Sequence, residues 1–167
     1  MLYFSYGSNM SSRRLRERTP SARFVAVAKL KKHELRFHKA GKDGSAKCDA
    51  SETGRNGHAV IGVVFDISEA DKSELDRWEG LGKGYEEKPI ELETLNGKTM
   101  NAITYYATDI NSTLRPYSWY KNHVLSGAVE NGLPKNYIKM ITGVESLSDP
   151  RSERHKKEMA IYDDKVI

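Results

Sequence analysis

The chain has 167 residues, of which 30% are charged and 38% hydrophobic, which is typical of a soluble protein with one domain and its own core. No apolar run approaches the roughly 18 residues that a membrane-spanning helix needs. The first six residues lack the layout of a signal peptide, and a single cysteine excludes an internal disulfide. We therefore expect a cytoplasmic protein that does not bind membranes.

The net charge of +4 and the pI near 9.0 require nucleic-acid binding to be considered. The basic residues, however, lie in small groups that acidic residues mostly interrupt. No zinc spacing, glycine-rich phosphate loop or aromatic-rich basic stripe accompanies them. This pattern favours a solvated surface, and we expect no nucleic-acid partner.

In the first half of the chain, hydrophobic alternation and turn residues predict strands separated by short polar segments. Gly7-Ser8-Asn9 interrupts the first strand, and a short polar helix is expected at 11–18. The polar stretch 41–57 predicts a long loop with a short strand near 46–50. The expected strands are 2–6, 22–29, 33–38 and a buried 58–66.

In the second half, a helix is predicted from the capping pair Ser68 and Asp71 through Glu79, before a glycine-rich segment. Asn96-Gly97 is a strong hairpin signal between two further strands. The remaining expected elements are strands 88–94 and 98–108 and helices 116–131 and 134–141.

This order predicts an α+β fold, a small and mostly antiparallel β-barrel flanked by helices. We expect one domain over residues 1–145. Residues 146–167 form a charged tail without a stable apolar stripe, either helical or packed on the same domain. Such a tail is expected to be dispensable for activity.

Two places could carry chemistry. The junction Tyr6-Gly7-Ser8-Asn9 could direct successive backbone N–H groups at an anion, although on its own this segment favours an ordinary turn with a helix cap. Glu79 borders the predicted stripe of Ile67, Leu75 and Trp78 at a helix C-terminus. Burial and the helix dipole would both raise its pKa toward a range useful for acid–base catalysis, whereas a frayed helix end would leave an ordinary solvated carboxylate.

Other chemistry-bearing residues give weaker signals. The nine tyrosines could line a polar pocket or the rim of a core, and Cys48 is interpreted as a core thiol. The histidines at 33, 38, 58, 123 and 155 have no metal-ligand spacing, so we predict no metal site.

Three separated segments resemble the γ-glutamylcyclotransferase family and its AIG2-like relatives. They are Tyr3–Met10, with its YGSN motif; Leu75–Gly80, followed by Gly84-Tyr85; and Tyr120-Lys121, followed by Gly127–Pro134. Together they span roughly residues 2–142. The spacing between Glu79 and Tyr85 is one residue shorter than expected for the animal enzymes.

The resemblance implies a small barrel in which Glu79 is the catalytic acid–base. The residues that it implies for substrate binding are Tyr3, Phe4, Ser5, Tyr6, Gly7, Ser8, Asn9, Tyr85, Tyr105 and Tyr120. No cofactor or metal is implied. The expected partner is a small γ-glutamyl substrate, and the protein is expected to be a monomer or a homodimer.

The implied reaction converts a γ-glutamyl amino acid or amine to 5-oxoproline and a free amine, by attack of the substrate's own α-amine. Two alternatives stay open from the sequence. One is removal of a γ-glutamyl group from an amine-bearing metabolite, and the other is a non-catalytic protein that binds small molecules in the same pocket.

Overall fold

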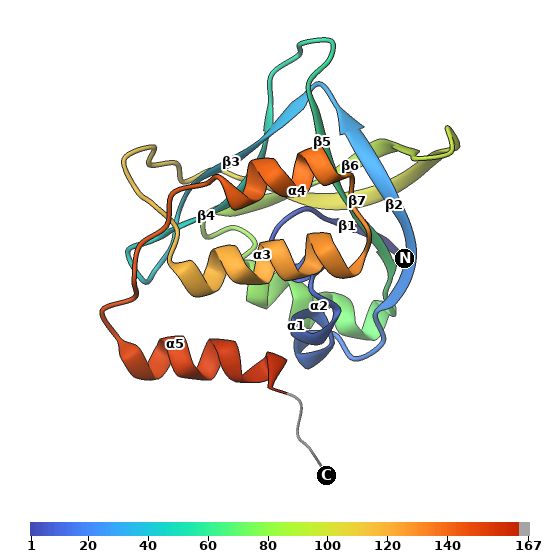
Figure 1. The fold of residues 1–167 in the computed structure, drawn as a ribbon. Helices are drawn as coiled ribbons and strands as arrows, with labels where there is room; N and C mark the ends of the chain where they lie inside the picture. The colour runs from blue at the N-terminus through green and yellow to red at the C-terminus, as the bar shows by residue number, and fades with distance from the viewer. Residues whose placement is uncertain (164–167) are drawn as a thin grey trace.

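A closed barrel of five strands, in the order β1–β5–β2–β6–β7, forms the centre of the protein (Figure 1). The structure, a computed structural model, describes residues 1–163. The barrel strands are β1 (Leu2–Ser5), β2 (Arg23–Lys31), β5 (Ala59–Asp66), β6 (Tyr85–Thr94) and β7 (Thr99–Ala107). One parallel pairing, between Tyr3 and Ile103, joins β1 to β7, and the other four pairings are antiparallel. The predicted fold class is confirmed.

Strand β1 packs very closely on β5, because β5 carries a glycine at the crossing point. A Cβ atom on Gly62 would lie 2.3 Å from the carbonyl oxygen of Ser5 and 2.9 Å from the ring of Phe4. Phe4 is fully buried with its ring in this space, and Val63 and Val64 of β5 are fully buried too. The alternation of β1 therefore turns Phe4 into the core, and Tyr3 and Ser5 point to the opposite side.

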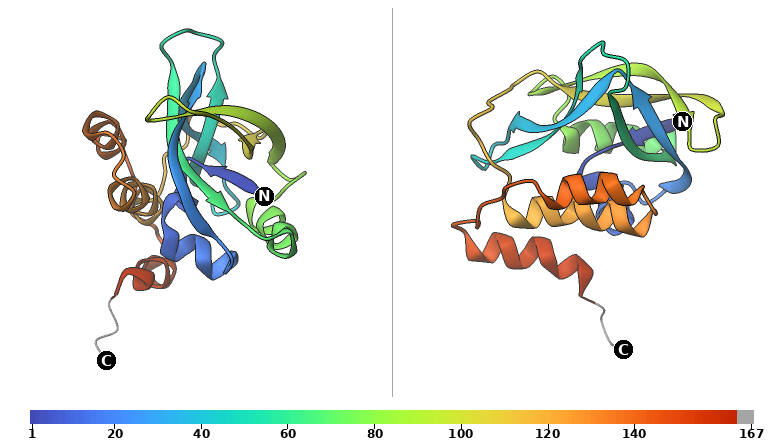
Figure 2. Two further views of the ribbon diagram at one scale, coloured as in Figure 1. Left: turned by 90° about the vertical axis from the view of Figure 1, so that its right-hand side faces the viewer. Right: turned by 45° about the horizontal axis from the view of Figure 1, so that its top comes forward.

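Helices cover the barrel on two sides. Helix α2 lies on one side of the barrel strands, and α3 and α4 lie on the other (Figure 2). None of the helices in residues 1–163 is long and apolar enough to cross a membrane. The α-helices are α1 (Ser12–Arg18), α2 (Glu69–Glu79), α3 (Ser118–Glu130), α4 (Lys135–Thr142) and α5 (Ser152–Met159), and the 3₁₀ turns are η1 (Ser8–Met10) and η2 (Ala160–Tyr162).

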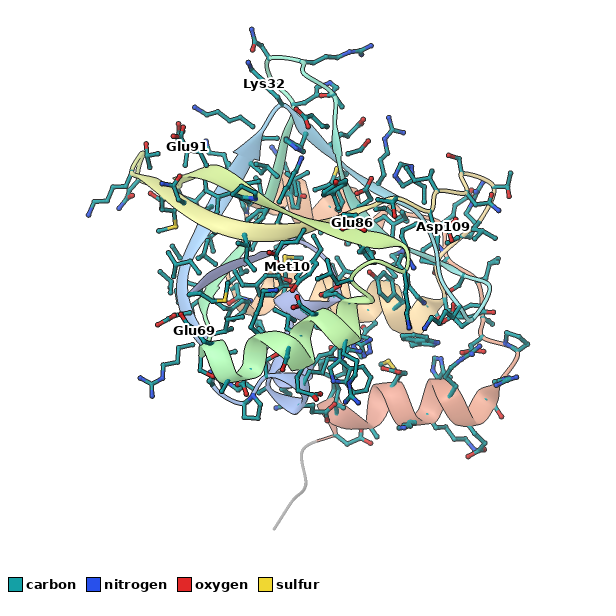
Figure 3. All side chains as sticks on the ribbon, turned by 180° about the vertical axis from the view of Figure 1, so that it is seen from behind. Met10, Lys32, Glu69, Glu86, Glu91 and Asp109 are labelled. Atoms are coloured by element: carbon teal, nitrogen blue, oxygen red, sulfur yellow. The ribbon has the colours of Figure 1, made fainter. Side chains whose placement is uncertain are left out.

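A glycine in α3 brings that helix against η1. A Cβ atom on Gly127 would lie 2.4 Å from the backbone nitrogen of Ser11 and 2.5 Å from the carbonyl carbon of Met10. Met10 is fully buried near the middle of the molecule, whereas Lys32 and Glu91 lie at its periphery (Figure 3). The position of the loop after β1 therefore depends on contact with α3.

The prediction for residues 41–57 was partly wrong. The structure has a hairpin of β3 (His33–Ala40) and β4 (Ala46–Glu52) that forms a separate two-stranded sheet, and only residues 41–45 connect the two strands. Its buried side chains Ala46, Cys48 and Ala50 are small, so they gave little hydrophobic signal. In β4, the backbone nitrogen of Cys48 donates a hydrogen bond to the hydroxyl of Tyr120, and its carbonyl accepts one from the hydroxyl of Tyr85. These two hydrogen bonds join the hairpin to α3 and β6.

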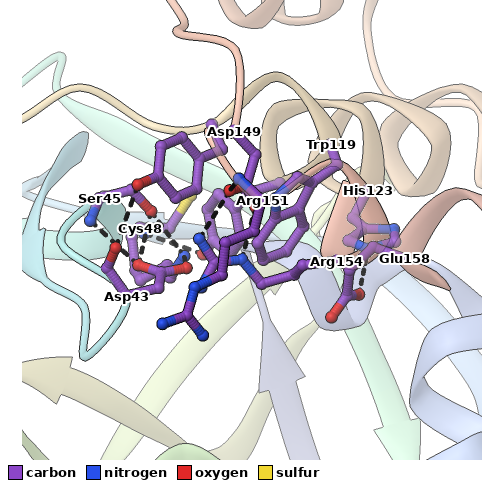
Figure 4. Close-up of polar contacts among 12 residues, drawn as sticks. Asp43, Ser45, Cys48, Trp119, His123, Asp149, Arg151, Arg154 and Glu158 are labelled. Carbon is purple, nitrogen blue, oxygen red and sulfur yellow. Dashed lines mark hydrogen bonds and ion pairs between the residues drawn. The ribbon is translucent and has the colours of Figure 1, made fainter. Parts of the chain in front are cut away.

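The segment after residue 146 is part of the packed structure. Asp149 accepts hydrogen bonds from the indole nitrogen of Trp119 (2.8 Å) and from Arg154 (2.5 and 2.7 Å) (Figure 4). In α5, Glu158 contacts Arg14 at 2.5 Å and the fully buried His123 at 2.9 Å. The sequence predicted a segment that is helical or packed on the same domain, and these contacts pack it against α1 and α3. Its dispensability for activity stays a prediction.

Glu158 gives a test of that packing. Burial opposes ionisation of this carboxylate, but the hydrogen bond with His123 and the charge of Arg14 outweigh it and lower the pKa to about 2. A depressed pKa stabilises the fold above the unfolded value of about 4.3, and that contribution is lost as the pH falls toward 2. We expect Glu158→Gln to be less stable than wild type at pH 7, with the difference shrinking below pH 4. Denaturant titrations of both proteins across this pH range measure the difference in the free energy of unfolding. A difference that does not change with pH would contradict the role of Glu158.

A second prediction concerns the contact between α3 and η1. Gly127→Ala places a methyl group against the backbone of Met10 and Ser11 and should cost about 1–3 kcal/mol of stability. Gly143→Ala is the matched control, because its Cβ would make only ordinary contacts at 3.6 Å and its φ is −75°. We expect the thermal midpoint to fall only in Gly127→Ala. Equal thermal midpoints for the two variants would show that η1 can move away from α3 without a loss of stability.

Candidate active site

A small cavity lies where β1, η1, β4 and the end of α2 meet. We call it the inner cavity. It brings together Glu79 and nine of the ten residues predicted to bind substrate. These nine are Tyr3, Ser5, Tyr6, Gly7, Ser8, Asn9, Tyr85, Tyr105 and Tyr120.

Glu79 is the last residue of α2, and its carboxylate points at the loop after β1. Gly80 ends the helix in the left-handed conformation (φ 72°), which glycine adopts without strain. The Oε1 atom of Glu79 accepts hydrogen bonds from the amide of Asn9 at 2.6 Å and from the hydroxyl of Tyr3 at 3.1 Å. Two donors from the first strand and its loop therefore fix one carboxylate oxygen.

The pKa of Glu79 is raised above the ordinary glutamate value. Burial is the largest effect and favours the protonated form, whereas the charge of Arg18 and the hydrogen bonds from Tyr3 and Asn9 oppose it. No lysine or arginine in residues 1–163 lies within ion-pair distance of this carboxylate. The group can therefore gain and lose a proton more readily near neutral pH than a solvated glutamate.

The tyrosines of the inner cavity are held by hydrogen bonds and stay protonated. Tyr85 donates to the carbonyl of Cys48 at 2.5 Å, Tyr6 donates to the carbonyl of Tyr105 at 2.6 Å, and Tyr120 accepts from the nitrogen of Cys48 at 2.9 Å. Burial raises the pKa of Tyr3, Tyr6, Tyr85 and Tyr120 well above the ordinary value. These hydroxyls offer neutral polar contacts to a bound molecule.

The loop after β1 offers further donors. Among the described residues, no atom accepts a hydrogen bond from the backbone nitrogen of Gly7 or Ser8. A Cβ atom on Gly7 would lie 3.1 Å from the Cβ of Cys48, so glycine allows the loop to approach β4 closely. The hydroxyl oxygen of Ser5 is buried in the cavity wall without a partner. Buried polar atoms are usually paired, so these groups point to a polar ligand.

Two expectations require correction. The side chain of Phe4 lies in the core against Gly62 and does not line the inner cavity, because the alternation of β1 turns it away. Trp78 is 52% exposed and does not share the buried face of Leu75. Its ring lies instead under the guanidinium of Arg18, 4.8 Å from the ring centroid.

Some residues of the site were missed from the sequence. Arg18 donates to the side-chain oxygen of Asn9 at 3.2 Å and has the strongest charge effect on Glu79. Its spacing of four from Arg14 places both on one face of α1, which was the available signal. Thr104 and Cys48 also line the inner cavity, and burial raises the pKa of the Cys48 thiol to about 12. That thiol is therefore a poor nucleophile.

Comparison with known proteins identifies the family. The sequence pattern of the AIG2-like family matches residues 59–141. Bovine γ-glutamylcyclotransferase is 35% identical over 154 residues, which cover 86% of this chain and 78% of the bovine protein. The human γ-glutamylcyclotransferase is 33% identical with the same coverage. The chain belongs to the γ-glutamylcyclotransferase family.

Solved structures agree with this assignment. A structure named γ-glutamyl cyclotransferase has a TM-score of 0.81 and 29% identity, and the match covers 93% of this chain and 98% of that one. An uncharacterized human protein has the same TM-score at 31% identity, over 87% of this chain. The protein is therefore an enzyme of the γ-glutamylcyclotransferase type, and its predicted family is confirmed.

The pKa of Glu79 should respond to Arg18. Because the guanidinium charge stabilises the carboxylate form, Arg18→Gln should raise the pKa of Glu79 further. Carbon NMR titration of the Glu79 carboxyl in both proteins measures the shift, and Arg16→Gln, on an exposed residue of α1, is the control. If the pKa of Glu79 falls or stays unchanged in Arg18→Gln, the charge of Arg18 does not stabilise the Glu79 carboxylate.

Proposed function

We propose that the protein converts a γ-glutamyl amino acid or amine to 5-oxoproline and a free amine, with Glu79 as the acid–base. The observation that carries the proposal is the half-buried carboxylate of Glu79, which has no ion pair with any residue in 1–163 and is bonded to Tyr3 and Asn9 in a cavity lined by hydroxyl groups. Family membership supplies the reaction class.

The inner cavity would hold the γ-glutamyl half of the substrate. The free backbone donors of Gly7 and Ser8 are assigned to its carboxylate or to the oxyanion that forms at the side-chain carbonyl. The hydroxyl of Ser5, which has no partner in the described chain, is assigned a further contact. Binding in this position would bring the α-amine near its own γ-carbonyl. Intramolecular ring closure of this kind gains roughly 7–11 kcal/mol from positioning.

Two protons move from the attacking nitrogen to the leaving nitrogen. The carboxylate of Glu79 takes a proton from the substrate ammonium, and the resulting amine attacks the γ-carbonyl carbon. A carbon–nitrogen bond forms and the carbonyl electrons move to the oxygen. The carboxylic acid of Glu79 then gives this first proton to the leaving nitrogen, takes the second proton from the attacking nitrogen and passes it on in the same way. The electrons on the oxygen re-form the carbonyl as the amide bond breaks, and the leaving group departs as an ammonium ion. This sequence balances without a metal or an organic cofactor.

The tyrosine hydroxyls have supporting tasks in this scheme. Tyr3 and Asn9 hold one oxygen of Glu79, so the other oxygen is available for the proton. Tyr105 donates to Asp76 at 2.5 Å, one turn before the end of α2, and so ties that helix to β7. The hydrogen bonds of the cavity wall would keep the reacting groups in place without changing their own protonation.

Glu79→Gln tests the proposal. The amide keeps the volume of the side chain but cannot exchange a proton, so release of 5-oxoproline from a γ-glutamyl amino acid should fall roughly 10²–10⁴-fold. Substrate binding, measured by calorimetry, should persist. Glu74→Gln, an exposed change in the same helix, is the matched control and should keep its activity.

Other outcomes would redirect the proposal. Release of free glutamate in place of 5-oxoproline would indicate hydrolysis of the γ-glutamyl bond. Binding without turnover by the wild-type protein would indicate a non-catalytic binding protein. A folded Glu79→Gln variant that cyclises at the wild-type rate would contradict the role of Glu79.

A further inference from the structure

A second and larger cavity adjoins the inner one, and we call it the outer cavity. It is much larger than the inner cavity, and it is open to solvent. The two share Ser8, Glu79, Tyr85 and Tyr120 as lining residues. Because Glu79 lies at the junction, a substrate with its γ-glutamyl half inside would extend its amine half into the outer cavity.

The outer cavity carries a surplus of positive charge. Of the cationic residues that line it, Arg14, Lys47 and Arg77 have carboxylate partners in Glu158, Asp43 and Glu74. Four others form no ion pair with any residue in 1–163, and the only acidic lining residues are Asp43, already paired, and Glu79. The four cations are Arg18, Lys39, Lys42 and Lys83.

Lys39 is the most informative of the four. Only 8% of this lysine is exposed, and in the described chain its ammonium group has no hydrogen bond and no ion pair. It lies 5.0 Å from the ring centroid of Tyr85, and Gly84 leaves room for it, because a Cβ there would lie 3.0 Å from Nζ. The longer-range charge of Asp109 favours the ammonium, but burial outweighs it and lowers the lysine pKa. Burying an ammonium is costly, and contact with one ring offsets only part of that cost.

Arg18 lines the same cavity as Lys39 and Glu79. One of its nitrogens donates to Asn9 and its plane lies over Trp78, but its remaining donors have no carboxylate partner in residues 1–163. Burial lowers the pKa of Arg18 to about 10, so it stays charged at neutral pH. A guanidinium with free donors suits a carboxylate, which it can bind through two parallel hydrogen bonds.

We propose that Lys39 and Arg18 form an anion subsite that selects γ-glutamyl substrates whose amine half is acidic, such as an acidic amino acid or a short acidic peptide. The proposal rests on the reaction proposed above and specifies its substrate. A single carboxylate would satisfy one of these two cations, and an amine half with two carboxylates satisfies both. Neutral amine halves gain no electrostatic attraction in the outer cavity, and diamines are repelled by its positive charge.

The test is a series of γ-glutamyl compounds whose amine halves differ in charge: a diamine, ethylamine, alanine and glutamate. We expect kcat/KM for 5-oxoproline release to rise along this series, with at least about a tenfold gain from ethylamine to glutamate. Because the attraction is electrostatic, the gain should shrink at high salt. Lys39→Gln should reduce the gain about tenfold or more, whereas Lys98→Gln, an exposed lysine outside both cavities, should not.

Binding measurements keep the subsite and the reaction separate. Calorimetry of the same series on Glu79→Gln should show the same ranking by charge, even if no compound is turned over. Ranked binding to this variant, together with no 5-oxoproline from the wild-type enzyme, would contradict the proposed reaction and support the subsite. Turnover of all compounds at equal kcat/KM would contradict the subsite and leave the reaction standing. An equal loss for every compound in Lys39→Gln would also overturn the subsite, because it would show that Lys39 only supports Tyr85.

Discussion

The site depends on one constraint, the partial burial of a carboxylate at the end of a helix with no cation of residues 1–163 within ion-pair distance. Glu79 avoids part of the cost of that burial because Tyr3 and Asn9 donate hydrogen bonds to it, and because the charge of Arg18, which is bonded to Asn9, favours the carboxylate form. These partners come from β1, η1 and α1, three successive elements that must fold against α2 for the carboxylate to be held. The tight contacts at Gly62 and Gly127 set the positions of β1 and η1, and so they belong to the same constraint.

In the proposed reaction, the two cavities would divide the recognition of the substrate by its chemistry. The inner cavity offers hydroxyl and backbone donors in a small space, which suits an invariant γ-glutamyl group. The outer cavity is wide, open and positively charged, which suits an amine half of variable shape but of one charge type. Glu79 lies between them, where a proton has to pass from one nitrogen to the other.

Most of the fold was predictable because hydrophobic and polar residues alternate along several strands and because turn residues mark the ends of elements. Helix α2 also has a clear cap at Ser68, whose side chain accepts a hydrogen bond from the nitrogen of Asp71. Strand β4 was underestimated because its buried residues are alanine and cysteine, and the segment from 146 was underestimated because it packs through ion pairs and not through an apolar stripe. Motif resemblance placed nine of the ten predicted binding residues around one cavity. It could not assign Phe4 to the core, nor find Arg18 and Lys39, whose roles arise only from contacts between distant elements.

The most direct test of the central claim compares two pKa values for the same group in the free enzyme. One is the pKa of the Glu79 carboxyl from carbon NMR, and the other is the acidic limb of kcat/KM for a γ-glutamyl substrate. The account predicts that the two values coincide and that both lie above the ordinary glutamate value near 4.3, because burial raises the pKa of Glu79. A carboxyl that titrates at its ordinary value, or a rate limb that lies apart from it, would contradict the assignment of Glu79 as the acid–base.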